Sequence, residues 1–233
     1  MICIMSRYDT PTLLRQLPLF SALSEEEIQR VSAATAQLRV SSGARLFSRG
    51  DPCNGFHVVI KGRVKLLLET SDGAEKVMEI CGPGQSFGEA VMFLQKPYFF
   101  AAEALEASLL LHIGRGAVMN EIDNNPEFAR QMLAALSKRL HQLVCDLEAF
   151  TLRDGTQRVA AYLLQERGEG ERSGSFEIRL PVSKGVLASK LNITREHFSR
   201  ILNELSNAGL VHVQGPVIRV LDAVKLRQHV GVG

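Results

Sequence analysis

The arrangement of hydrophobic and polar positions changes twice along the chain. From about residue 43 to residue 113, short apolar runs such as "FHVVIKG" and "RVKLLLE" are separated by turn residues such as Asp72-Gly73. Short strands at a spacing of roughly 8 to 12 residues are typical of an antiparallel sandwich or barrel. Before this region, Ser24 and Glu27 form a capping-box pattern. We therefore predict a β domain preceded by one short helix.

After "NNP" at residues 124–126 the period lengthens, and apolar residues recur every three or four positions. This spacing predicts a long helix with one apolar stripe. The stripe consists of Met132, Leu136, Leu140, Leu143, Leu147 and Phe150. A repeat of about 3.5 residues lets a helix pair with its own copy, so we expect a parallel homodimer. The alternative is that the stripe packs on the β domain of the same chain.

The last third contains two short apolar patterns separated by a break. Leu187, Ala188 and Leu191 form the first, and Asn192-Ile193 forms the break. The second pattern comprises Phe198, Ile201, Leu202 and Leu205. A small residue such as Ala188 lets two helices cross closely, and asparagine tolerates a left-handed turn. Together these features predict a helix-turn-helix.

Thr194 is a suitable N-cap for the second of these helices. Arg195, Glu196, Ser199 and Arg200 then lie on its outward face near the N-terminus, where a recognition helix contacts base edges. Arginine suits the O6 and N7 atoms of guanine, and glutamate accepts a hydrogen bond from the N4 amine of cytosine. The alternative is a solvated face on which Glu196 and Arg200 form a salt bridge across one helical turn. Both interpretations can hold together.

Beyond Gly209, a predicted helix C-cap, "LVHVQGPVIRVLD" alternates between apolar and polar residues around a Gln-Gly-Pro turn. The pattern predicts a β-hairpin wing after the second helix. Lys184 and Arg219 are candidate contacts to DNA phosphates, and solvated surface is the alternative for each.

Composition narrows the class of protein. With 45% hydrophobic and 22% charged residues in 233, the chain has the composition of a globular protein of two domains. Its apolar runs are shorter than the roughly 18 residues of a membrane span, so we expect a cytoplasmic protein with no membrane partner. Residues 151–233 hold 12 Lys and Arg against 8 Asp and Glu, whereas residues 1–150 hold 15 against 17. The basic C-terminal third favours a polyanionic partner.

The four cysteines, Cys3, Cys53, Cys81 and Cys145, form no C-x-x-C pair, and no histidine lies at zinc-finger spacing. We expect reduced thiols and no metal site of that kind. The chain also has no phosphate-binding glycine loop and no Ser-His-Asp ordering. The sequence therefore does not predict an enzyme.

Several motifs together resemble transcription regulators of the CRP/FNR superfamily over essentially the whole chain. They are "FSRGDP", "GRVKL", "GPGQSFGEA", "RDGTQRVAAYLL" and "ITREHFSRILNELSNAGLV". The resemblance implies an α+β fold, with an antiparallel β-roll over residues 1–123, a dimerisation helix over 124–153 and a winged helix-turn-helix over 154–233. It also implies a homodimer that binds an inverted repeat of double-stranded DNA, with RNA polymerase as a further partner. The half-sites would lie about one helical turn apart, ~34 Å.

The resemblance assigns roles to single residues of the helix-turn-helix. Glu196 and Arg200 match the family's usual base-reading positions. Ser199 matches the serine of the FNR-like branch, and Arg195 matches an arginine of the cyclic-AMP branch. This mixture leaves the half-site sequence open.

The resemblance also locates an effector pocket. Gly88 and Glu89 match the cyclic-nucleotide-binding members, but Phe99 and Phe100 stand where those members have the Arg-Ser pair that holds the phosphate. Leu143 and Val144 likewise replace the Thr-Ser pair that meets the purine. A phosphate buried against aromatic rings without a cation costs several kcal/mol, so we expect that cyclic AMP is not the effector.

Two other effectors belong to related branches. An FNR-like iron-sulfur cluster is not expected, because Cys3 alone cannot supply the N-terminal cysteine group. The chain is similar to the nitric-oxide-responsive, denitrification-associated branch, whose apolar pocket is thought to accept haem. Haem needs an axial ligand, and the candidates are His57, His112, His141 and Cys145, although packing is the alternative for each. A cyclic-nucleotide-binding module that regulates an enzyme or channel is the second functional hypothesis.

Overall fold

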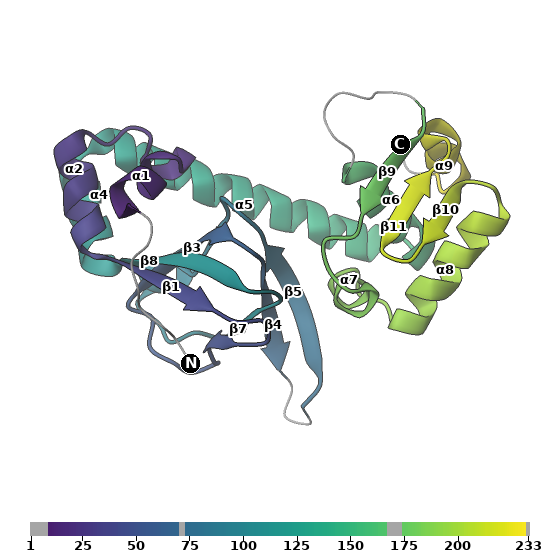
Figure 1. Cartoon of the computed structure of the whole chain (residues 1–233), viewed down its shortest axis with the longest axis horizontal. Helices are drawn as coiled ribbons and strands as arrows, with labels where there is room; N and C mark the ends of the chain where they lie inside the picture. The colour runs from purple at the N-terminus through teal and green to yellow at the C-terminus, as the bar shows by residue number, and fades with distance from the viewer. Residues whose placement is uncertain (1–8, 70–72, 167–173, 232–233) are drawn as a thin grey trace. The chain divides into compact units, whose positions relative to one another are not determined.

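The computed structural model describes residues 9–69, 73–166 and 174–231. The chain divides into two compact units, Met1–His141 and Gln142–Gly233 (Figure 1). The boundary falls inside the long helix α5, Pro126–Leu152, which the hydrophobic stripe predicted. None of the described helices is both long enough and apolar enough to cross a membrane.

Two four-stranded antiparallel sheets form the centre of the N-terminal unit. The first sheet has the order β1-β8-β3-β6 and the second has the order β2-β7-β4-β5. The strands are β1 (Thr35–Val40), β2 (Arg45–Phe47), β3 (Gly55–Lys61), β4 (Val64–Glu69), β5 (Glu75–Cys81), β6 (Ser86–Phe87), β7 (Ala101–Ala104) and β8 (Ser108–Gly114). The antiparallel β domain predicted from the short apolar runs is therefore confirmed.

The two sheets of this unit share one apolar core. Val59 of β3 and Leu110 of β8 contribute from the first sheet, and Phe47, Leu66 and Ala102 contribute from the second. The first sheet is buried on its other face as well, because Phe56 and Leu111 belong to a second core cluster with the helices. This explains why β3 and β8 are almost continuously apolar in sequence.

Short helices cover that second face (Figure 1). They are α1 (Thr10–Arg15), the 3-10 turn η1 (Pro18–Phe20), α2 (Glu25–Ala33), α3 (Glu89–Leu94) and α4 (Arg115–Asn124). Helix α2 begins with the predicted capping box, since Glu27 N donates to the Ser24 hydroxyl and Ser24 N donates to the Glu27 carboxylate at 2.7 Å. The sequence signal for this helix start is thus confirmed.

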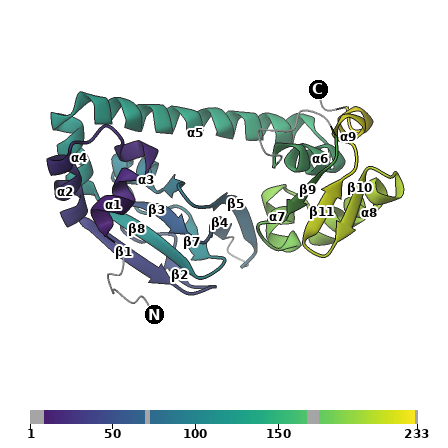
Figure 2. The ribbon, with the colours of Figure 1, turned by 45° about the horizontal axis from the view of Figure 1, so that its top comes forward.

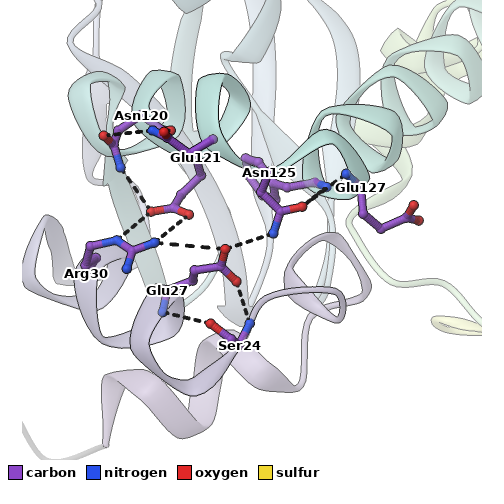
Figure 3. Close-up of polar contacts among 9 residues, drawn as sticks. Ser24, Glu27, Arg30, Asn120, Glu121, Asn125 and Glu127 are labelled. Atoms are coloured by element: carbon purple, nitrogen blue, oxygen red, sulfur yellow. Dashed lines mark hydrogen bonds and ion pairs between the residues drawn. The ribbon is translucent and has the colours of Figure 1, made fainter.

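A polar network joins α2 to the first turn of α5 (Figure 3). Glu121 of α4 is fully buried, and its carboxylate accepts two hydrogen bonds from Arg30 at 3.1 and 3.2 Å. Asn125 donates to Glu27 at 3.0 Å and accepts from Glu127 N, so it caps the long helix. Because an unpaired buried carboxylate would be costly, these bonds fix where α5 starts relative to its own β domain.

The C-terminal unit packs helices and one three-stranded antiparallel sheet around a single core (Figure 2). Its elements are α6 (Gly155–Gln165), β9 (Phe176–Arg179), α7 (Lys184–Lys190), α8 (Arg195–Asn207), β10 (Val211–Gln214), β11 (Val217–Val220) and α9 (Ala223–His229). Strands β10 and β11 form the predicted wing, and β9 pairs with the other edge of β11. The expected α+β class, with a β-roll, a long helix and a winged helix-turn-helix, is confirmed.

Candidate nucleic-acid interface and effector region

The turn between α7 and α8 is fixed by local backbone chemistry. Asn192 has φ of +58°, the left-handed conformation that asparagine tolerates better than most residues. Two residues later the Thr194 hydroxyl accepts a hydrogen bond from His197 N at 3.1 Å and caps α8. Helix α8 therefore starts where the sequence predicted, with Arg195 as its first residue.

The two sides of α8 differ sharply in burial. One side is fully buried in the core of the C-terminal unit through Phe198, Ile201, Leu202 and Leu205. Arg195, Glu196 and Arg200 are exposed on the other side, and Ser199 is half-buried. Since the apolar side holds the helix, the polar side near its N-terminus is available to a ligand. The structure thus brings all four predicted base-reading residues onto one accessible surface.

The positive charge of Arg200 on this surface forms only a long ion pair. Arg200 Nε lies 4.0 Å from Glu204 Oε1, and both side chains are more than half exposed. The salt bridge of Arg200 is therefore made with Glu204 and not with Glu196, the partner that the sequence pattern suggested. An exposed pair of this kind contributes about 0.3–0.5 kcal/mol, so a base edge can readily compete for the guanidinium.

The two predicted phosphate contacts lie on different elements. Lys184 opens α7 directly after its N-cap, Ser183, and is half-buried. Arg219 is exposed on β11 of the wing. The wing turn contains Gly215 at φ of +59°. The C-cap of α8 is Ala208, and Gly209, the predicted C-cap, follows it at φ of +68°.

In the N-terminal unit, the candidate effector region surrounds the start of α3. Gly88, at φ of +97°, precedes Glu89, the first residue of α3. Glu89 is almost fully buried, and this burial raises the pKa of its carboxyl group. Arg139 of α5 forms an ion pair with Glu79 and donates to the Ser86 carbonyl at 3.3 Å. The positive charge of Arg139 is thus already paired with the carboxylate of Glu79.

The three adjacent aromatic residues, 98–100, have different surroundings. Tyr98 is buried and stacks on Phe47 with ring centroids 3.6 Å apart, and Phe100 is buried 5.6 Å from the same ring. Phe99 is 54% exposed and meets the edge of Phe100. Phe100 therefore belongs to the core of the β domain, whereas Phe99 does not. The change in direction follows from the irregular backbone between α3 and β7.

Each of the two units contains a match to a known protein family. Residues 37–125 match the cyclic nucleotide-binding domain family, and residues 157–229 match the Crp-like helix-turn-helix domain family. The chain is 32% identical to the solved structure of DNR from Pseudomonas aeruginosa, which covers 96% of this chain and 99% of that one, with a TM-score of 0.51. The chain belongs to the CRP/FNR family of transcription regulators.

Other CRP/FNR relatives cover most of the chain at lower identity. The CRP-like cAMP-activated global transcriptional regulator of Mycobacterium tuberculosis is 26% identical over 205 residues, which is 86% of this chain and 92% of that protein. The crystal structure of a putative cyclic nucleotide binding protein from Ruegeria pomeroyi is 30% identical in sequence. The match covers 98% of this chain and 100% of that one, with a TM-score of 0.63. The CRP/FNR assignment makes this chain a DNA-binding transcription regulator with a cyclic-nucleotide-binding-like sensor domain.

The long helix of this CRP/FNR protein exposes most of the predicted apolar stripe. Leu140, Leu143 and Leu147 are 54–65% exposed in the single chain, and Leu136 is half-buried. Met132 differs, because it is 3% exposed and packs in the core of its own β domain with Phe128. It was therefore wrongly placed in the dimer seam. The side chain of Phe150 falls outside those described.

The neighbouring Leu133 takes the place of Met132 in the stripe. It is 64% exposed and lies three residues before Leu136, so the 3.5-residue repeat continues through it. Val144 is 56% exposed beside this seam. Leu143 and Val144 belong to the C-terminal unit and Gly88 belongs to the N-terminal one, so their meeting in an effector pocket stays a prediction.

The four candidate haem ligands fall into two groups. His57 and His112 are cross-strand neighbours inside the β-roll, with ring centroids 4.7 Å apart. Burial lowers the pKa of His57 to about 3, with a smaller contribution from His112. His141 and Cys145 are exposed on α5 and lie four residues apart, as the helical spacing predicted.

Sequence reasoning missed one residue that supports the recognition helix. Arg158 of α6 donates to three backbone carbonyls: Arg153 at 2.7 Å, Leu191 at 3.0 Å and Asn192 at 3.4 Å. It thereby ties the start of α6 to the turn that precedes α8. An arginine within the buried stretch of α6 was a signal, because a charged group beside a core needs partners, but its carbonyl partners are 33 and 34 residues away.

Proposed function

We propose that this regulator acts as a homodimer in the cytoplasm and binds an inverted repeat of double-stranded DNA through two copies of α8. The observation that carries the proposal is the accessible surface formed by Arg195, Glu196, Ser199 and Arg200 on a helix whose other side is core. Arginine and glutamate at the N-terminal end of such a helix can read the major-groove edges of guanine and cytosine. We infer a regulator that recruits or blocks RNA polymerase and has no catalytic activity.

The dimer is supported by the uncovered face of α5. Leu133, Leu140, Leu143 and Leu147 are each more than half exposed in one chain, at spacings of three, four and seven residues. Leucines at this repeat pack as knobs into holes of a second helix, which removes them from water. Dimerisation through α5 would give the assembly a two-fold axis that matches an inverted repeat.

The effector is proposed to be something other than cyclic AMP. A cyclic nucleotide brings a phosphodiester anion that needs a charge-assisted donor. The segment from Tyr98 to Phe100 offers aromatic rings, and the guanidinium of Arg139 is already bound to Glu79. The nearby carboxyl group of Glu89 would add repulsion in its ionised form.

One observation favours the second candidate, a cyclic-nucleotide-binding regulatory module. Residues 37–125 match the cyclic nucleotide-binding domain family, and Gly88 and Glu89 lie at the start of α3 within that range. In this alternative, Arg139 would exchange the Glu79 carboxylate for a phosphate.

The histidine pair inside the β-roll is packed among aromatic rings, so we do not propose these two residues as haem ligands. His57 is buried, and its ring centroid lies 5.1 Å from that of Phe87 and 5.7 Å from that of Phe47, whereas His112 is half-buried beside it. His141 and Cys145 are the accessible pair, and we propose them as the ligands to test if haem is the effector.

The proposed function is tested by selecting duplexes from a random-sequence pool with the purified full-length protein. We expect an inverted repeat with half-sites about one helical turn apart. Recovery of no preferred sequence would contradict the proposal. Calorimetric titration with cyclic AMP and cyclic GMP separates the two effector candidates, because micromolar binding would establish the second. An absorption spectrum with haem, for the wild type and for His141→Ala, tests the haem ligands.

A further inference from the structure

The wing hairpin, formed by β10 and β11, has a turn without positive charge. The turn residues Gln214, Gly215 and Pro216 are exposed, and Val217 follows them. A loop that approaches DNA usually does so through cations, because neutralised phosphates release counterions and supply most of the sequence-independent affinity. If the wing touches DNA, its cation must come from a neighbouring element.

That neighbour is Arg179, the last residue of β9. Arg179 lies directly opposite Val217 in the β9–β11 ladder, and the next residue, Leu180, donates its backbone N–H to the Pro216 carbonyl at 2.8 Å. Adjacent strands are about 4.7–4.9 Å apart. The end of β9 is therefore fastened to the wing turn, and the arginine is held beside it.

Arg179 projects from the solvent side of the wing sheet. Its strand neighbour Ile178 is buried opposite Ile218, so the alternate residues face outward. Arg179 is exposed, and within the described parts of the chain its side chain has no hydrogen-bond or ion-pair partner. Its charge is thus available to a ligand.

The other arginine on this side has a different setting. Arg219 lies directly opposite Glu177, and an opposite charge at a cross-strand position partly compensates it. Arg179 faces an uncharged valine at the equivalent position. Of the two, Arg179 is the stronger source of positive potential at the wing turn.

We infer that Arg179 is a phosphate-contacting residue that carries the positive charge of the wing, with Arg219 as a weaker contributor. The inference rests on the proposed DNA-binding function and adds a contact that positions the protein without reading sequence. Two copies in the dimer would hold the phosphates that flank the grooves entered by the two α8 helices.

The test measures the affinity of the full-length protein for a duplex selected by the wild type and for a random-sequence duplex, across a series of salt concentrations. Arg179→Gln should weaken binding to both duplexes by the same factor. It should also reduce the slope of log affinity against log salt by about 0.9 for each bound protomer. Arg179→Lys should restore the slope, and Arg219→Gln should change it less.

Arg227→Gln is the matched control, because it removes one exposed charge from α9, which lies at the end of the unit away from α7 (Figures 1 and 2). If Arg179→Gln gives the same slope as Arg227→Gln, the inference is wrong even though DNA binding stands. If the wild type does not distinguish the selected duplex from the random one, the proposed function itself fails.

Discussion

The two units differ in where their candidate working surfaces lie relative to the core. In the C-terminal unit, the polar side of α8 is exposed and the same helix is anchored by four buried apolar side chains. In the N-terminal unit, the candidate effector region adjoins a core filled by Phe47, Tyr98 and Phe100. A recognition residue can therefore be changed without loss of stability, whereas a sensor residue also affects packing.

The long helix gives the largest expected effect, because its apolar side is exposed in one chain and covered in the proposed dimer. Leu140→Asp would place an uncompensated charge in the seam from both copies, each costing about 3–5 kcal/mol. We expect a folded monomer that no longer binds the inverted repeat. Analytical ultracentrifugation measures the change. Lys138→Asp, on an exposed position outside the seam, is the control and should remain dimeric.

Phe99 and Phe100 are adjacent in the N-terminal unit but differ in burial, so their substitution should change stability by different amounts. Phe100→Ala should lower the free energy of unfolding by about 3–5 kcal/mol, because the side chain is buried. Phe99→Ala should cost about 0.5–1.5 kcal/mol, the size of its contact with Phe100. Urea unfolding, monitored by hydrogen exchange of the backbone amides in the N-terminal unit, measures the free energy of unfolding of both variants. Equal losses would mean that Phe99 is not exposed in solution.

Arg158→Ala tests whether the C-terminal unit depends on the support of its turn. Loss of charged hydrogen bonds to the carbonyls of Leu191 and Asn192 should destabilise this unit by about 1.5–3 kcal/mol. DNA affinity should fall with it. Arg158→Lys should recover little, because an ammonium lacks the planar fork of donors. Thermal unfolding measures the effect, and an unchanged melting temperature would count against the role.

Lowering the pH should destabilise the N-terminal unit more than the C-terminal unit. The folded pKa of His57 is lowered to about 3 by burial, so below its ordinary value of 6.5 the unfolded state binds more protons than the folded state. The free energy of unfolding should fall by about 1.4 kcal/mol per pH unit between those values. His57→Gln should flatten this dependence. His212→Gln, an exposed histidine of the C-terminal unit, should leave it unchanged.

The difference between features set by neighbouring residues and features set by long-range contacts explains what the sequence could predict. The proposed DNA-binding surface lies within one short segment, so the N-cap at Thr194 and the left-handed Asn192 place its four residues on one side. Met132 was misplaced because Met132 and Leu133 are adjacent and the spacing fits either one. The assembled core decides which of them is buried, and Met132 lies in the cluster that the first helices and the first sheet form.

Residues joined by long-range contacts could not be predicted in the same way. The partners of Arg158 and the pairing of Arg139 with Glu79 depend on elements that are far apart in the chain. The role proposed for Arg179 depends on its strand register with Val217, and register is fixed by the assembled sheet.

The central claim, that α8 reads base sequence, is tested most directly by Arg200→Ala. The ratio of affinities for the selected and random duplexes should fall by a factor that corresponds to about 1–3 kcal/mol for each half-site, with the dimer intact. Glu204→Gln, which removes only the weak salt-bridge partner, should leave that ratio nearly unchanged. A wild-type ratio in Arg200→Ala would show that this face of α8 does not read DNA.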